Sequence, residues 1–413
     1  MATVVLLGTL DTKGTEYAYL AERVREYGAD VLLVDAGTHP PAGIRPDVTR
    51  EEVAAAAGAD VAALAAAGDR GAAVEAMGRG AAEVLKRLQG ESRLDGVAGL
   101  GGSGGSSLVT HAMRALPVGV PKLMVSTVAS GDTRPYVGAT DVTMTYSVVD
   151  ISGINRISAR ILDNAAGAIA GMARASAGFA PRPGGKPLVA ATMFGVTTPC
   201  VTRARERLEE LGYEVLVFHA TGTGGQSMEA LIEGGFIAAC LDVTTTELAD
   251  ELVGGVLSAG PDRLSAAGRA GIPQVVSVGA LDMVNFGPAD TVPERFAKRL
   301  LYRHNPTVTL MRTTAEECAE LGRRIARKLN AAKGPTSLFL PLKGISMIAA
   351  EDQIFHDREA DEALFSALRE NLAPAVEVVE HNTDVNDPTF AVAMADRLHE
   401  LHAHALTERE APV

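Results

Sequence analysis

Tryptophan is absent from this sequence, and cysteine is scarce. The 413 residues include only three cysteines, Cys200, Cys240 and Cys318, and no two of them form a C-x-x-C pair. This spacing predicts neither a disulfide framework nor a zinc site. Isolated thiols are typical of proteins from a reducing compartment, so we expect a cytoplasmic location.

Long hydrophobic runs and clusters of positive charge are also missing. The sequence has no run of about 18 apolar residues, and no charged start followed by an apolar segment, so we expect no membrane span and no export signal. Asp and Glu total 51 against 38 Lys and Arg, which gives a net charge of −13. Because non-specific nucleic-acid binding needs a cationic face, we expect no nucleic-acid partner.

Short β-rich runs alternate with amphipathic helical ones along the whole chain. "TVVLLG" is typical of a buried strand, residues 15–27 of a helix, and "ADVLLVD" of a second strand. This rhythm predicts an α/β fold: two Rossmann-like doubly wound domains, each with a mainly parallel sheet, and a ligand cleft between them. We interpret the Ala-rich region 50–88 as helices that only pack.

A Pro- and Gly-rich segment, "SAGFAPRPGGKP", divides the chain. We predict an N-terminal domain of residues 1–178, a linker of residues 179–187 and a C-terminal domain of residues 188–413. After the linker the pattern restarts, and the two halves align without a gap when Gly28 meets Gly212 and Asp35 meets His219. This indicates a duplicated fold; the alternative is the general likeness of any two α/β halves.

The stretch "GLGGSGGSS", residues 99–107, carries far too many glycines for a strand or a helix interior. It matches G-x-G-x-x-G, but it does not follow the first strand of its domain and no acid lies about 20 residues on, so a dinucleotide fingerprint is disfavoured. Glycines allow close backbone approach, and a helix beginning at Ser106 or Ser107 would direct its N–H groups at an anion. We predict phosphate binding; the alternative is a tight loop without a ligand. The predicted phosphate loop comprises Gly101, Gly102, Ser103, Gly104, Gly105, Ser106 and Ser107.

Other small or charged residues follow the strands of the same half. "GTLDTKG" supplies Thr9, Asp11, Thr12 and Lys13 after the first strand, although its Lys and Gly stand in the reverse of the P-loop order. Lys13 could meet a phosphate, or be a solvated loop charge, and Asp11 could hold Mg²⁺ through water. The predicted ligand-binding set also includes Asp35, Ser126 and Thr127.

The second half offers further candidates. "HATGTGGQS" places Gly224 and Gly225 before a helix that Ser227 could cap, while Thr244 and Glu247 have the spacing of a capping box. A helix cap is also predicted at Thr313 or Thr314. The candidate catalytic residues are Lys13, His219, His304 and Arg312; for the last two, a structural network is an equal alternative.

Six motifs together resemble one family, that of the ATP-binding amino-terminal region of the tomato mosaic virus resistance protein and its bacterial relatives. They are "GTLDTKG", "GLGGSGGSS", "TMFGVTTPCV", "HATGTGG", "HNPTVTLMRTTAEE" and "NDPTFA", and the resemblance runs from Thr3 to about Leu401. It implies two Rossmann-like subdomains, bound ATP with Mg²⁺, a homodimer and a barrel-fold partner protein. One loop departs from the family, with Ala349 in place of the usual acid and Asp352 in place of Gly.

These observations lead to one expected function and two alternatives. We expect an ATP-dependent enzyme of small-molecule metabolism that acts with a barrel partner. The first alternative is a non-catalytic dimer that ATP stabilises and that docks another protein. The second is a binder of a different phosphorylated metabolite, such as a sugar or acyl phosphate.

Overall fold

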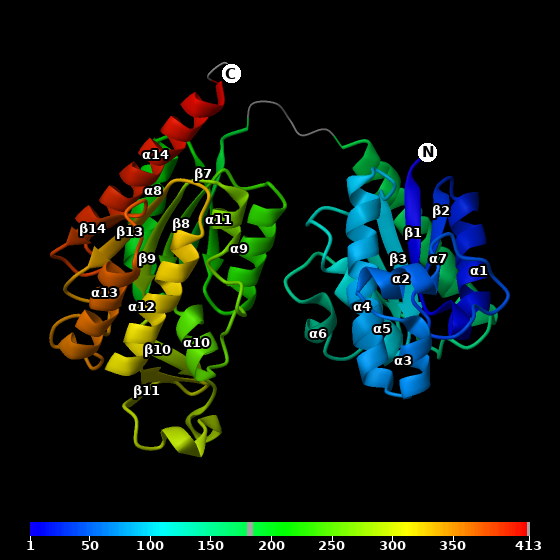
Figure 1. Cartoon of the computed structure of the whole chain (residues 1–413), viewed down its shortest axis with the longest axis horizontal. Coiled ribbons are helices and arrows are strands. Elements are labelled where there is room, and N and C mark those ends of the chain that lie inside the picture. Colours follow the sequence, from blue (N-terminus) through cyan, green and yellow to red (C-terminus); the bar gives the residue numbers. More distant parts are fainter. Residues whose placement is uncertain (180–184, 411–413) are drawn as a thin grey trace. The chain divides into compact units, whose positions relative to one another are not determined.

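The computed structural model describes residues 1–179 and 185–410, which form two compact units, Met1–Arg182 and Pro183–Val413 (Figure 1). Residues 180–184 of the predicted linker lie outside the described residues. The two units carry separate sheets, and every described strand of the two large sheets is parallel to its neighbours, so the predicted α/β fold class is confirmed. The predicted cleft between the halves stays a prediction.

The first unit is built on a five-stranded sheet with the order β2-β1-β3-β4-β5. The strand order reverses between β1 and β3, and in doubly wound sheets ligands bind beyond the carboxyl ends of the strands at such a point. The strands are β1 (Thr3–Gly8), β2 (Asp30–Asp35), β3 (Gly96–Gly101), β4 (Lys122–Ser126) and β5 (Thr143–Tyr146).

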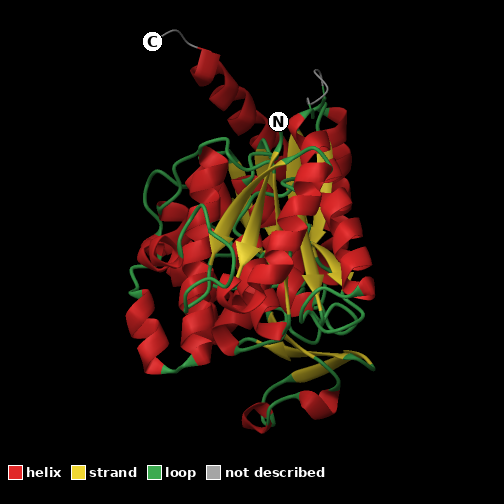
Figure 2. Ribbon diagram, turned by 90° about the vertical axis from the view of Figure 1, so that its right-hand side faces the viewer, coloured by secondary structure: helices red, strands yellow, loops and turns green. Residues whose placement is uncertain are grey.

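Helices cover both faces of this sheet, as Figures 1 and 2 show. One hydrophobic cluster joins α1 and α7 to one face, and a second joins α2, α4 and α5 to the other. Their apolar residues recur at helical spacing, so each helix presents one apolar side to the strands. The helices are α1 (Leu10–Glu26), α2 (Arg50–Ala56), α3 (Val61–Ala67), α4 (Arg70–Gly90), α5 (Ser103–Met113), α6 (Arg134–Val137) and α7 (Arg156–Ala177).

Tyr17 holds β1 and β3 together where they diverge. The two strands pair only from Val4 and Gly96 to Leu6 and Ala98. Beyond that, the Leu100 amide donates to the Tyr17 hydroxyl at 2.9 Å, and this hydroxyl donates to the Leu7 carbonyl at 2.5 Å. The side chain therefore replaces the missing ladder hydrogen bonds beneath the switch point.

Helix α5 begins earlier than the sequence predicted, and α1 has an additional first turn. The Asp35 carboxylate accepts the Leu10 amide at 3.1 Å and supports a turn at Leu10–Thr12. Lys13 has non-helical backbone angles, and the helix that continues beyond this kink begins close to the predicted residue 15. Helix α5 starts at Ser103 rather than at Ser106 or Ser107. The segments interpreted as loops are therefore mostly first turns of helices.

The second unit repeats this topology with one additional strand, in the order β14-β13-β9-β8-β6-β7. The predicted alignment agrees with the structure: Gly28 and Gly212 have φ of +80° and +95° before the second strand, and Asp35 and His219 each end that strand. The strands are β6 (Leu188–Met193), β7 (Glu214–His219), β8 (Ala239–Thr244), β9 (Gln274–Gly279), β13 (Thr336–Pro341) and β14 (Glu377–His381).

Helices α8 and α14 pack on one face of this sheet, and the remaining large helices pack on the other. Figure 2 also shows a short antiparallel sheet of β10, β12 and β11 beyond one end of the main strands, which the sequence did not predict. The elements are η1 (Gly195–Thr197), α8 (Thr198–Glu210), α9 (Thr223–Glu233), α10 (Glu247–Val253), α11 (Ala266–Ala270), β10 (Met283–Phe286), η2 (Ala289–Thr291), η3 (Glu294–Phe296), β11 (Leu301–Asn305), β12 (Val308–Arg312), α12 (Ala315–Asn330), α13 (Arg358–Asn371) and α14 (Pro388–Glu410).

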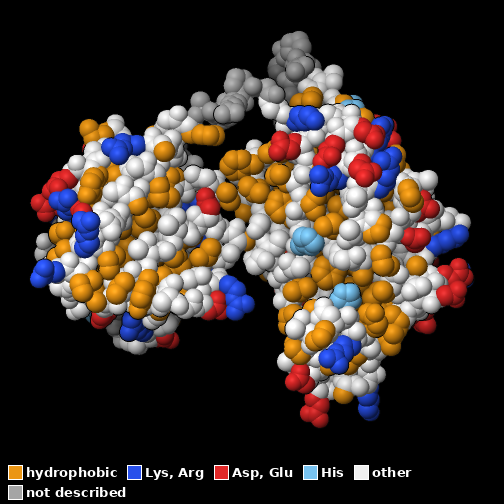
Figure 3. Space-filling model, turned by 180° about the vertical axis from the view of Figure 1, so that it is seen from behind, with side chains coloured by type: hydrophobic (Ala, Val, Ile, Leu, Met, Phe, Trp, Pro, Cys, Tyr) orange, Lys and Arg blue, Asp and Glu red, His pale blue; other side chains and the backbone are white. Residues whose placement is uncertain are grey.

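Two findings bear on membrane and nucleic-acid partners. Among the helices of residues 1–179 and 185–410, none combines the length and apolar character that crossing a bilayer requires. On the face that Figure 3 shows, Lys and Arg side chains are interspersed with Asp and Glu rather than gathered into one patch. The expected lack of a nucleic-acid partner stays a prediction.

Candidate functional site

A cavity of about 380 Å³ lies at the carboxyl ends of the strands in the first unit. Its walls come from the start of α1, the segment after β2, the helices α3 and α4, and the first turn of α5. This is the switch point between β1 and β3, where ligands of doubly wound sheets bind. The polar lining consists of Thr9, Asp11, Thr12, Thr38, His39, Asp69 and Arg70, with Gly104 and Gly105 between them.

The glycines of residues 99–105 serve close packing rather than backbone freedom. None of them has a positive φ, and Gly99 and Gly101 belong to β3. A Cβ atom at Gly99 would lie 2.6 Å from Val109 Cγ1, and one at Gly101 would lie 3.1 Å from the Gly105 Cα atom. The prediction that this stretch is too flexible for a strand or helix is therefore wrong, because the glycines let α5 lie close against the sheet.

The start of α5 is open toward the cavity. Its N-cap residue, Gly102, makes no side-chain hydrogen bond, so the amides of the first turn are not capped by a side chain. The Arg70 guanidinium lies beside them, since a Cβ atom at Gly104 would be 3.2 Å from Arg70 Nη2. Among the described residues Arg70 has no ion-pair partner. A helix start and a cation thus face the same cavity, which favours an anion.

Ser106, Ser126 and Thr127 hold the site in place rather than line it. The Ser106 and Ser126 hydroxyls are fully buried and lie 2.6 Å apart, which joins α5 to the end of β4. The Thr127 amide donates to the Gly101 carbonyl at 3.2 Å. Ser103 and Ser107 are exposed. The lining of the cavity includes none of these five residues.

Two aspartates meet beside the cavity. Asp11 Oδ2 accepts the amides of Thr38 at 3.2 Å and His39 at 3.1 Å, and Asp35 Oδ1 accepts the Gly37 amide at 2.9 Å. Burial raises the pKa of Asp35, and the negative charge of Asp11 raises this pKa further. In the described part of the chain, Asp11 Oδ1 and Asp35 Oδ2 are buried without a hydrogen-bond partner.

Those two oxygens are the atoms that fit a hard cation such as Mg²⁺. No group of three or more His, Cys, Asp or Glu side chains within the described residues is arranged to hold a metal ion. A magnesium ion at Asp11 would therefore need water or ligand oxygens to complete its coordination, as Mg²⁺ commonly does at phosphate sites.

Lys13 does not reach the cavity. Its ammonium group donates to the Ile151 carbonyl and joins α1 to the segment before α7. Lys13 is therefore neither among the lining residues nor the freely solvated charge that the sequence offered as the alternative.

The sequence did not predict the wall that α3 and α4 contribute. Region 50–88, expected only to pack, supplies Arg70 together with the apolar lining residues Leu64, Val74 and Met77. One local signal was present: Asp69 caps α4, and Arg70 follows as its first residue, where a cation opposes the helix dipole. Such a local conflict is typical of a residue with a functional role.

In the second unit, the protein's own carboxylate occupies the glycine-rich helix start. Helix α9 begins at Thr223, and Glu247 Oε1 accepts the Gly222 amide at 2.7 Å and the Gly225 amide at 3.1 Å. A Cβ atom at Gly225 would lie 2.2 Å from Glu247 Oε2, and one at Gly224 would lie 1.8 Å from the His219 carbonyl oxygen. These glycines therefore accommodate protein atoms.

Two predicted helix caps in this unit are wrong, and one is correct. The N-cap of α10 is Thr246, without a side-chain bond, because Glu247 is turned toward α9 instead of forming a capping box with Thr244. Ser227 lies inside α9, where its hydroxyl donates to the Thr223 carbonyl. The cap of α12 is Thr314, which forms a capping box with Glu317.

The other candidate catalytic residues, His219, His304 and Arg312, lie on three different strands of the second unit. His219 ends β7 and is exposed, and His304 is exposed in β11. Arg312 is buried, and its Nη2 donates to Asp361 Oδ1 at 2.6 Å while its Nε donates to the Phe355 carbonyl at 2.8 Å. These contacts favour the structural alternative for Arg312.

The chain is a Rossmann-like α/β protein of two units, each built on a doubly wound parallel sheet. The first unit has an open glycine-rich helix start at the switch point of its sheet. The chain belongs to the uncharacterised protein family UPF0261. The model of the family's N-terminal domain matches residues 2–178, and that of its C-terminal domain matches residues 186–402.

Relatives confirm the resemblance that the motifs indicated. A UPF0261 protein of Clostridium tetani is 55% identical over 397 residues, covering 96% of this chain and 98% of that protein. One of Mesorhizobium japonicum is 48% identical, with the same coverage. The tomato protein described as ToMV resistance protein Tm-1(GCR237) is 41% identical over 428 residues, which cover 96% of this chain and 55% of the tomato protein.

One solved structure shows a distant likeness to this chain. A UDP-N-acetylglucosamine 2-epimerase from Rickettsia bellii is 10% identical with a TM-score of 0.24, and covers 98% of each chain. A likeness at this level carries no functional argument.

Proposed function

We propose that this protein binds ATP in the cavity of the first unit, with the phosphates at the start of α5. The observation that carries the proposal is the meeting of an uncapped helix start with the Arg70 guanidinium next to Gly104. Main-chain amides and a helix dipole bind a phosphate, and arginine can donate two parallel hydrogen bonds to it.

The division of the lining into a polar and an apolar part supports a nucleotide. Thr9 and Thr12 contribute hydroxyl groups to the lining, whereas Leu64, Val74 and Met77 offer an apolar wall. In our proposal the phosphates lie against the polar part and the base against the apolar wall, as is common in ligand sites. Asp11 would hold Mg²⁺ through water on the polar side.

The activity that we propose is that of an ATP-dependent enzyme of small-molecule metabolism, acting as a homodimer with a barrel-fold partner. A non-catalytic dimer stabilised by ATP, and a binder of another phosphorylated metabolite, remain the alternatives. The resemblance supports the dimer and the partner, and the tomato relatives extend well beyond the matched region. Mass spectrometry of what the purified protein carries separates ATP from sugar or acyl phosphates.

Substitution of Arg70 tests the ATP site. We expect Arg70→Gln to weaken ATP binding at least about tenfold in titration calorimetry with Mg²⁺, because a hydrogen bond to a charged group contributes about 1.5–3 kcal/mol. Arg79→Gln is the matched control: it is an exposed arginine of the same helix, paired with Glu75 and outside the cavity. Equal affinities of the two variants would contradict the proposed site.

A second variant blocks the cavity itself. Gly104→Val adds a side chain whose nearest neighbour is the flexible end of Arg70, so the helix keeps its conformation while the phosphate position is filled. We expect no measurable ATP binding.

ATP consumption by the wild type, measured with and without a barrel partner, then distinguishes an enzyme from an ATP-stabilised dimer.

A further inference from the structure

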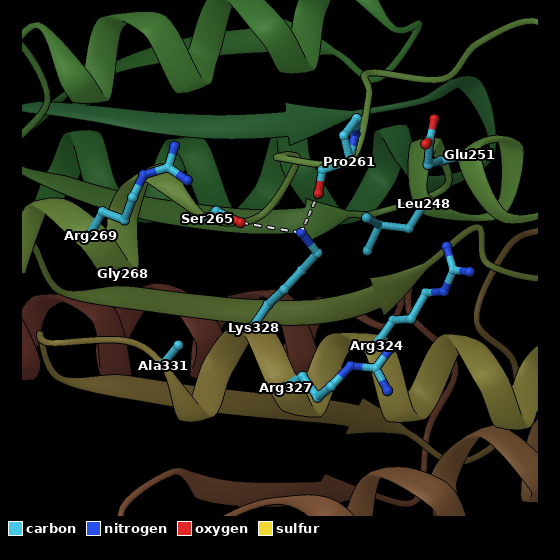
Figure 4. Close-up of a pocket in the computed structure, with 10 residues that line it drawn as sticks. All are labelled: Leu248, Glu251, Pro261, Ser265, Gly268, Arg269, Arg324, Arg327, Lys328 and Ala331. Atoms are coloured by element: carbon cyan, nitrogen blue, oxygen red, sulfur yellow. Dashed lines mark hydrogen bonds between the residues drawn. The ribbon is translucent and has the colours of Figure 1, made fainter. Parts of the chain in front are cut away.

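The second unit has a cavity of about 450 Å³ of its own, between α10, α11 and α12, on the flank of the sheet (Figure 4). Four cationic side chains line it, Arg269, Arg324, Arg327 and Lys328, against a single lining carboxylate, Glu251. Of these cations, Arg269 pairs with Glu233 and Asp262, which lie outside the lining. The chain as a whole carries a net charge of −13, so this local excess of positive charge is opposite in sign to the average surface. A cavity of this size accommodates a small metabolite.

Lys328 reaches across the cavity without meeting a carboxylate. Figure 4 shows its side chain extending from α12 to the segment before α11, where Nζ donates to the Pro261 carbonyl at 2.6 Å and to Ser265 Oγ at 3.2 Å. Among the described residues it has no ion-pair partner. Because an ammonium group has three N–H donors, one remains for a ligand.

The arginines also keep donors for a ligand. Arg324 uses its Nε in a 3.0 Å contact with Glu320, and Arg327 lies 3.5 Å from the same carboxylate. Glu320 is not part of the cavity lining, and the one carboxylate that is, Glu251, accepts the Ser258 hydroxyl. An arginine has five N–H donors, so most of those on Arg324 and Arg327 are not used by Glu320.

Spacing on α12 brings these cations to one side of the helix. Arg324, Arg327 and Lys328 stand at positions i, i+3 and i+4, which lie next to one another on a helix surface. The buried side chain of Leu248 on α10 adds an apolar contact opposite them. Three cations on one side of α12, with the apolar Leu248 opposite them, match a small molecule that has a doubly charged group and a carbon skeleton.

We propose that this cavity binds a small phosphorylated metabolite, with its phosphate held by Arg324, Arg327 and Lys328. The proposal does not depend on ATP binding in the first unit. A phosphate dianion accepts several hydrogen bonds at once and suits the planar donors of arginine.

The test uses inorganic pyrophosphate as the probe and the full chain carrying Gly104→Val, whose side chain fills the phosphate position of the first-unit cavity, so that this cavity does not contribute. Titration calorimetry should show saturable binding that Arg324→Gln weakens about tenfold. Arg323→Gln is the matched control, because Arg323 also pairs with Glu320, at 2.9 Å, but does not line the cavity. No saturable binding, or equal losses in the two variants, would overturn the proposal.

A measurement on the wild-type protein avoids any effect of substitution on folding. Lysine acylation followed by peptide mass spectrometry should show pyrophosphate protecting Lys328, while the exposed ammonium of Lys86 on α4 reacts equally with and without the probe. Unchanged acylation of Lys328 at a pyrophosphate concentration that saturates the calorimetric signal would place the ligand elsewhere and overturn the proposal.

Discussion

Tyr17 shows how one buried hydroxyl fixes the geometry beneath the first-unit cavity. It bridges the Leu7 carbonyl and the Leu100 amide, and it is fully buried. Gly8 has to lack a side chain, since a Cβ atom there would lie 1.9 Å from the Tyr17 hydroxyl oxygen. The tyrosine therefore determines how far β1 and β3 diverge, and with it where the starts of α1 and α5 lie.

Removing this hydroxyl leaves a buried amide without its acceptor. We expect Tyr17→Phe to lower the free energy of unfolding by about 1–3 kcal/mol, the cost of an unsatisfied buried polar group. Tyr19→Phe is the control, because the half-buried Tyr19 hydroxyl lies 3.5 Å from the Ala159 carbonyl and contributes little. Urea unfolding of both variants measures the difference, and equal losses would contradict the role of Tyr17.

Asp250 gives the second unit a pH-dependent stability. Burial raises its pKa from 3.8 to about 7. Hydrogen bonds from Asn285 and Leu257 lower this pKa, but burial is the larger effect. Asp282 shifts in the same direction, to about 6, also through burial. Between about pH 4 and pH 7 the native state therefore holds protons that the unfolded chain has released.

The sign of the pH effect follows from that difference in bound protons. We expect the free energy of unfolding of the second unit to fall as pH rises from 4 to 7, since these carboxyl groups lose protons more easily when unfolded. Asp250→Asn should flatten this dependence, because it removes the titrating carboxyl group. The new amide can pair with Asn285 Oδ1, which has no partner in the described part of the chain. The exposed Asp262, changed to Asn, should leave the slope as it is. Urea unfolding across this pH range provides the measurement.

At the scale of elements, two glycine-rich helix starts differ in what faces them. The start of α5 meets the Arg70 guanidinium, whereas the start of α9 meets the carboxylate of Glu247. Glu247 in turn accepts a hydrogen bond from Arg263 Nε at 2.6 Å, and both side chains are fully buried. The second unit thus fills its helix start internally, and the first leaves room for a ligand.

Removal of Glu247 leaves a buried arginine with one partner fewer. We expect Glu247→Ala to destabilise the second unit by about 3–5 kcal/mol, as breaking a buried ion pair does. The matched control is Glu233→Ala, which removes a half-exposed pair with Arg269 and should cost about 0–1 kcal/mol. Thermal and urea unfolding compare the two, and similar losses would show that the buried network contributes no more than a surface pair.

At the scale of the whole molecule, each unit has hydrophobic cores of its own. The clusters around Val5 and Val4 contain only residues of the first unit, and those around Val276, Val189 and Ala190 contain only residues of the second. A core that lies within one unit needs no residues of the other to form.

We therefore expect residues 1–178 and 188–413 to fold when expressed separately. Each fragment should unfold in one cooperative transition, followed by circular dichroism, and ATP should raise the melting temperature of the first fragment only. An unfolded first fragment would contradict the independence of its core. A folded first fragment on which ATP has no effect would instead contradict the proposed ATP site.

The regular features of the fold could be predicted because they leave periodic patterns. Buried strands, amphipathic helices and the matching Gly28 and Gly212 are local or repeated features. Each can therefore be predicted from its own stretch of sequence. Asp352 is a similar case: its φ of +64° lies in the left-handed region, which gives a physical reason for the Gly that the resemblance implies at this position. The short antiparallel sheet was missed because Leu301–Asn305 has little alternation of buried and exposed residues.

The sequence by itself determined the two doubly wound halves, the family and the presence of glycine-rich helix starts. Only the tertiary structure decided which helix start is open, because Arg70 and Glu247 reach α5 and α9 from other helices. It also turned Lys13 away from the cavity and placed Arg312 in a buried network. The physical reason is that periodicity reports which side of a segment is apolar, whereas the charge around a site depends on side chains that folding brings together from distant positions.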